Sequence, residues 1–121
     1  MIDELPETGG REQSLPPVSF GMMVVFCTFP SVEKAREVAG EIISEGLAAC
    51  VNILPGVESI YRWEGEIQNE SEVLGLFKVA SDGFQELEEA ILVKHPYDSP
   101  EIVGISADKV TGKYLEWVVA N

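Results

Sequence analysis

The chain contains one histidine, His95, in the segment His-Pro-Tyr-Asp-Ser-Pro-Glu that ends at Glu101. Histidine is the commonest protein metal ligand and titrates near neutral pH. A histidine and a carboxylate on a proline-stiffened loop could supply half of a site for a divalent cation or a small polar ligand, and water or a second subunit would have to complete it. The structural alternative is a polar cap, in which the imidazole bonds carbonyls at the C-terminus of a helix.

Two cysteines, Cys27 and Cys50, are the other candidate metal donors, because thiolates bind soft ions such as Cu(I). Both lie among apolar neighbours in segments that we expect to be strands, where a free cysteine usually packs as a small hydrophobic residue. They form no CxxC pair and are too few for a disulfide scaffold. We expect reduced thiols in a cytoplasmic protein, with burial and metal binding as the two alternatives.

Lys78 is a charged residue within a mostly apolar segment. A buried lysine needs a partner, and Glu64 and Glu101 are the candidates. A structural ion pair at a subunit boundary is the favoured interpretation. An enzyme that uses His95, Glu101 and Lys78 is the alternative.

Charge and motif content exclude several functions. The chain has 21 acidic and 8 basic residues, a net charge of −13, and its basic residues do not cluster. This pattern argues against binding to nucleic acid or to anionic membranes. The sequence contains no phosphate-binding glycine-rich loop and no GxSxG motif, and the apolar run at 18–29 is too short to span a bilayer as a helix. We therefore expect a protein that is not an enzyme and requires no cofactor.

These residues must be positioned by the secondary structure that apolar periodicity predicts. We expect a flexible N-terminal tail over 1–18 and one folded domain over 19–121. Its expected strands are 19–28, 48–67 with a bend at Pro55-Gly56, 73–80 and 101–106, and its expected helices are 32–45, 82–94 and 111–119. The order β-α-β-β-α-β followed by a helix predicts an α+β fold of the ferredoxin-like type, an antiparallel sheet with helices on one face.

The second and third strands would form a long hairpin with its turn at 68–70. Alternation places Val57, Ser59, Tyr61, Trp63 and Ile67 on one face and Glu58, Arg62, Glu64 and Glu66 on the other. Arms that extend beyond the sheet leave long edges exposed, and edges with large apolar residues favour self-association. We expect Ile60, Tyr61 and Ile67 to lie in an interface between copies.

Two consecutive segments resemble the CutA family of divalent-cation tolerance proteins: Leu-Ala-Ala-Cys-Val-Asn-Ile over 47–53, and Pro-Gly-Val-Glu-Ser-Ile-Tyr-Arg-Trp-Glu-Gly-Glu-Ile over 55–67. Lys78, the His95-Pro96-Tyr97 motif, Pro100-Glu101 and a Tyr-Leu-Glu-Trp segment over 114–117 follow in the family's order. The resemblance covers about residues 20–119. It implies a homotrimer of ferredoxin-like subunits, similar to the PII-type signal proteins, whose long hairpins contact neighbouring subunits.

The resemblance also implies a role in tolerance of divalent metals such as copper or zinc. Carried over by position, the metal-binding groups would be His95, Glu101, Cys27 and Cys50. Some family members have a further cysteine or histidine in the helix before the His-Pro-Tyr motif, whereas residues 90–94 of this chain contain neither. An inter-subunit cleft near Trp63, Lys78, Tyr97 and Glu64 is the better candidate for a site. A PII-like sensor of a small anion or metabolite, without a metal role, is the alternative function.

Overall fold

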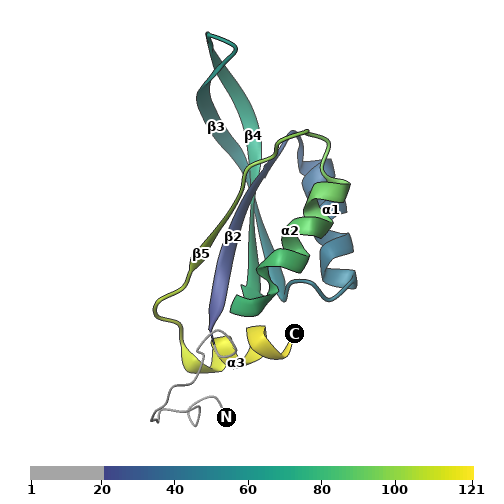
Figure 1. The fold of residues 1–121 in the computed structure, drawn as a ribbon, viewed down its shortest axis with the longest axis vertical. Helices are drawn as coiled ribbons and strands as arrows, with labels where there is room; N and C mark the ends of the chain where they lie inside the picture. The colour runs from purple at the N-terminus through teal and green to yellow at the C-terminus, as the bar shows by residue number, and fades with distance from the viewer. Residues whose placement is uncertain (1–20) are drawn as a thin grey trace.

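The computed structural model describes residues 21–121, which form a four-stranded antiparallel sheet and three helices (Figure 1). The predicted tail at 1–18 lies outside the described residues. The strand order is β3-β4-β2-β5, which confirms the ferredoxin-like prediction. In chain order the elements are β2 (Met22–Phe29), α1 (Val32–Ser44), β3 (Cys50–Trp63), β4 (Glu66–Ala80), a short 3₁₀ turn (Ser81–Gly83), α2 (Phe84–Lys94), β5 (Ile102–Ser106) and α3 (Gly112–Ala120).

The ends of α1 follow directly from the sequence. The hydroxyl of Ser31 accepts a hydrogen bond from the Lys34 amide at 3.1 Å and so caps the N-terminus. At the other end Gly46 has a φ of 73°, a left-handed conformation that favours glycine. The Leu47 amide then donates to the Ile42 carbonyl at 3.0 Å, which closes the helix in a Schellman motif.

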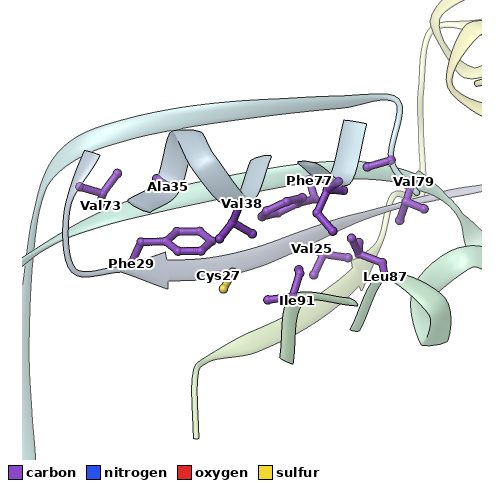
Figure 2. Packing of buried hydrophobic residues seen from close by; sticks show 12 residues of the cluster. Val25, Cys27, Phe29, Ala35, Val38, Val73, Phe77, Val79, Leu87 and Ile91 are labelled. Carbon is purple, nitrogen blue, oxygen red and sulfur yellow. The ribbon is translucent and has the colours of Figure 1, made fainter. Parts of the chain in front are cut away.

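One face of the sheet, here called the inner face, packs against α1 and α2. Strand residues alternate between faces, so every second residue of β2 and β4 points into this core, as Figure 2 shows for Val25 and Phe77. From the helices, Val38 and Ile42 of α1 and Leu87 of α2 are fully buried against them. This layer holds both halves of the chain together.

The opposite face of the sheet, here called the open face, is also apolar. Val24 and Phe26 of β2 lie beside Ile105 and Val103 of β5 in register, and Leu76 of β4 lies on the other side of Phe26. Val103 and Ile105 remain 47% and 52% exposed. Figure 1 shows α1 and α2 on the inner side only, with α3 near one end of the sheet. A broad apolar strip of the described domain therefore faces outward.

The hairpin turn lies at Glu64-Gly65, so the predicted turn at 68–70 was wrong. Glu64 and Gly65 have φ values of 51° and 81°, as a two-residue turn matched to the strand twist requires. As a consequence Ile67 pairs with Arg62 and shares its face, not the face of Trp63 as predicted. Glu66 correspondingly pairs with Trp63 and lies on the Trp63 face, so it too was assigned to the wrong side.

The predicted bend in the second strand is confirmed. The register of β3 with β4 shifts between Leu54 and Val57, where Pro55 precedes Gly56, which has a φ of 84°. Such a bulge bends a strand and increases its twist. Beyond it both arms leave the body of the sheet as an extension (Figure 1).

Candidate functional site

His95 lies at the C-terminal end of α2, where its own amide donates to the Ile91 carbonyl at 2.8 Å. Its ring is enclosed, with the residue only 8% exposed. The ring stacks on Phe29 with centroids 4.9 Å apart, and the Tyr97 ring lies 4.8 Å away at a tilt of 53°. The end of β2 and the loop after α2 thus form a closed pocket around the imidazole.

Both ring nitrogens of His95 are used. Nε2 lies 2.7 Å from the carbonyl oxygen of Thr28, and the Tyr97 amide donates to Nδ1 at 3.1 Å. Because Nδ1 accepts, the neutral ring carries its proton on Nε2 and donates it to Thr28. Burial lowers the pKa of His95 below its usual 6.5, against the opposing effects of the Thr28 carbonyl and the Glu72 charge. A metal could reach this ring only by replacing one of its hydrogen bonds, so the structural alternative fits better, although the carbonyl belongs to β2 and not to the helix.

Tyr97 extends this network to the hairpin. Its hydroxyl donates to Glu72 Oε2 of β4 at 3.1 Å, and burial together with Glu72 raises the pKa of Tyr97 to about 12. Further along the hairpin, the Tyr61 hydroxyl donates to Glu70 Oε1 at 2.7 Å. Sequence reasoning missed Glu72, because its partner is distant in the chain. The only sign in the sequence was that Glu70 and Glu72 lie two residues apart, which places them on the same face of a strand.

The two cysteines lie on opposite faces of the sheet. Cys27 is fully buried in the inner core and its sulfur lies among the apolar side chains of Figure 2. Burial, with smaller effects from Glu101 and Glu72, raises the pKa of Cys27 to about 12, which disfavours the thiolate that a metal needs. Cys50 is partly exposed and pairs in register with Lys78, and its thiol contacts the Tyr114 hydroxyl.

The four predicted metal ligands do not form a set within one chain. Among residues 21–121, no group of three or more histidine, cysteine or acidic side chains is placed to hold a metal ion. His95 is occupied by its two hydrogen bonds, Cys27 is protonated in the core, and Cys50 faces the other way. The donors that the described part of one chain offers therefore do not fit a resident copper or zinc ion.

Lys78 also differs from its prediction. Its ammonium donates to the Asn52 side-chain oxygen on the neighbouring strand, not to Glu64 or Glu101. Trp63 and Glu64 lie at the hairpin turn, while Lys78 is twelve residues along β4 from the partner of Trp63, a distance of about 40 Å at 3.4 Å per residue. The predicted cleft residues Trp63, Lys78, Tyr97 and Glu64 can meet only if different copies contribute them.

The fold and this arrangement define a class of protein. A ferredoxin-like domain with one covered face, one open apolar face and a projecting hairpin has the features typical of a subunit of an assembly. A family model of the CutA1 divalent ion tolerance proteins matches residues 23–121. The chain belongs to this family.

Individual relatives agree with the family match. The divalent-cation tolerance protein CutA of Thermus thermophilus is 45% identical over 98 residues, which is 81% of this chain and 95% of the relative. The chloroplastic CutA of Arabidopsis thaliana is 42% identical over 79% of this chain, but the match spans only 53% of the plant protein. The crystal structure of CutA1 from Oryza sativa has a TM-score of 0.80 at 42% identity, covering 84% of this chain and 93% of that one.

An archaeal neighbour bears on location. The periplasmic divalent cation tolerance protein CutA of Archaeoglobus fulgidus has a TM-score of 0.78 at 32% identity, covering 80% of this chain and 94% of that one. Within residues 21–121, no helix has the length and apolar character needed to cross a membrane. The cytoplasmic location therefore stays a prediction.

Proposed function

We propose that this protein is a homotrimeric divalent-cation tolerance protein whose subunits associate through the open face of the sheet. The observation that carries the proposal is the apolar strip of Val24, Phe26, Leu76, Val103 and Ile105, whose residues are partly or about half exposed. A soluble domain rarely leaves so continuous an apolar surface in water, because each half-buried aliphatic side chain still favours removal from it. The family supplies the trimeric stoichiometry.

The hairpin extends the same surface. In β4 every second residue from Lys78 through Leu74 to Glu70 lies on the open face, and Tyr61 bonds to Glu70 from the same side. Trp63, which is 60% exposed, therefore continues the open face beyond the body of the subunit. Ile60 and Ile67 lie on the reverse side of the hairpin and remain candidates for contact with a further copy.

In this proposal the cation binds at the boundary between subunits, since the donors within residues 21–121 of one chain do not form a site. Cys50 is the soft donor that stays accessible on the open face, and ligands from a second copy would complete its coordination of copper or zinc. Calorimetric titration of Cu(II) and Zn(II) into the wild type and into C50S tests this. Binding at micromolar concentration that C50S loses and C27S retains supports it, whereas no uptake by the wild type contradicts it.

A small-molecule sensor of the PII type is the second candidate. The observation that favours it is the Lys78 ammonium, which lies on the open face with only an amide partner in the described chain. A cation beside an aromatic side chain from another copy, such as Trp63, suits a carboxylate or phosphate ligand. Thermal shifts with a panel of anionic metabolites should then appear in the wild type and disappear in K78M, and a panel without shifts contradicts the idea.

We further propose that the protein does not catalyse a reaction. Of the three residues of the enzyme alternative, His95 is engaged in the loop, Lys78 bonds to Asn52, and Glu101 is exposed. A triple variant that loses an activity shown by the wild type would contradict this proposal.

A further inference from the structure

The His95 ring connects three parts of the fold that are separate in sequence. Nε2 donates a hydrogen bond to the Thr28 carbonyl near the end of β2. Nδ1 accepts one from the amide of Tyr97 within the loop 95–101. Tyr97 in turn bonds Glu72 where the hairpin leaves the sheet. Through its own bonds and those of Tyr97, the imidazole therefore links β2, the loop 95–101 and the hairpin.

We propose that His95 is a proton-sensitive latch: the neutral ring, anchored to the end of β2 through Nε2, holds the Tyr97 amide through Nδ1, and protonation releases Tyr97 from Nδ1 and loosens its bond to Glu72. This inference does not depend on the proposed function, because every group in it belongs to one chain.

The protonation state of Nδ1 decides whether Tyr97 is held. Nδ1 can accept the Tyr97 amide only while it has a lone pair. A proton at Nδ1 places two N–H donors against each other at the 3.1 Å separation of the present bond, so the Tyr97 amide must turn away. Nε2 keeps its proton throughout, and its bond to Thr28 persists. The change is thus confined to the loop side of the ring.

The surroundings of the ring determine the pH range. Lys34 of α1 opposes protonation and Glu72 of β4 favours it, while β2 contributes the neutral Phe29 ring and the Thr28 carbonyl. Lys94, the preceding residue of α2, is paired with Glu41 and Glu45 of α1 at 3.4 and 3.1 Å. Burial opposes the charged form, so the latch is closed at neutral pH and opens in mild acid.

The test uses the fact that His95 is the only histidine of the chain, so that its ring ¹⁵N resonances need no assignment by mutation. They are followed by NMR from about pH 7.5 to 4.5 together with hydrogen exchange at the Tyr97 amide. At neutral pH the Nε2–H tautomer is expected. The titration midpoint should lie below 6.5, and Tyr97 protection should fall about tenfold in step with it, as the loss of one hydrogen bond implies. A midpoint at or above 6.5, or unchanged Tyr97 protection across the titration, overturns the proposal.

Three conservative variants separate the titration of His95 from its relay to the hairpin, by which we mean the Tyr97–Glu72 hydrogen bond. E72Q should lower the His95 midpoint further, because the favourable charge is gone. Y97F keeps the amide and the titration but should abolish the accompanying shift of the Glu72 amide resonance. Y61F, which removes the neighbouring Tyr61–Glu70 bond, is the matched control and should change neither. A Glu72 response that persists in Y97F contradicts the relay.

Discussion

Truncation of Ile105 to alanine should weaken assembly without unfolding the subunit. Ile105 lies on the open face and is 52% exposed, so about half of its side chain remains to be covered by another copy. Full burial of an isoleucine is worth roughly 2–3 kcal/mol, which leaves about 1 kcal/mol for this contact. Three equivalent contacts give about 3 kcal/mol per trimer, or roughly a hundredfold decrease in the association constant.

Sedimentation equilibrium over a dilution series measures this decrease, and circular dichroism confirms that the subunit remains folded. Leu92 provides a matched control, since it is 47% exposed on α2 in the opposite layer. L92A should therefore leave the association constant unchanged. If I105A and L92A associate equally well, or if L92A is the weaker of the two, the open face is not the interface.

Three further results are expected. G104A should destabilise the fold by about 1–3 kcal/mol in urea unfolding, because its new Cβ would lie 2.8 Å from the terminal methyl of Met23 and 3.0 Å from the rigid ring of Phe84. Gly40 lies in the middle of α1 with open space where a Cβ would stand, so G40A should instead add about 1 kcal/mol to the stability. Equal effects of the two substitutions would refute the packing argument. Cys27 should not react with a thiol reagent until the chain unfolds, since it is fully buried, and rapid labelling in the native protein would contradict the core placement. Because the pKa of His95 is lowered in the fold, the unfolded chain takes up a proton at higher pH than the folded chain does. The free energy of unfolding should therefore fall as pH drops below 6.5 and level off below the folded pKa. Subtracting the same curve measured for H95Q isolates the contribution of His95, and a difference that does not change with pH would refute it.

Much of the fold could be predicted because local patterns state it directly. The Ser31 cap and Gly46 mark the ends of α1, and the Pro55-Gly56 bend is confirmed as a bulge. The hairpin turn was misplaced because Gln68-Asn69 looks like a turn by composition. Glu64-Gly65 forms it instead, since its left-handed backbone fits the twist of the two arms.

The candidate site was less predictable, because its contacts join residues far apart in the chain. The bonds of His95 to Thr28 and of Tyr97 to Glu72 cross 67 and 25 residues respectively. The partner of Lys78 depended on the register of β3 with β4, which places Asn52 within reach and leaves Glu64 at the far end of the hairpin. Residue types alone indicated which groups could do chemistry but not which faces they occupy.

The most direct test of the account is the mass of the wild-type protein in solution, measured by light scattering after size-exclusion chromatography. We expect a species of about three times the chain mass of 13.2 kDa that persists on dilution to micromolar concentration. A stable monomer would contradict it, because the apolar strip of the open face would then have no copy to cover it.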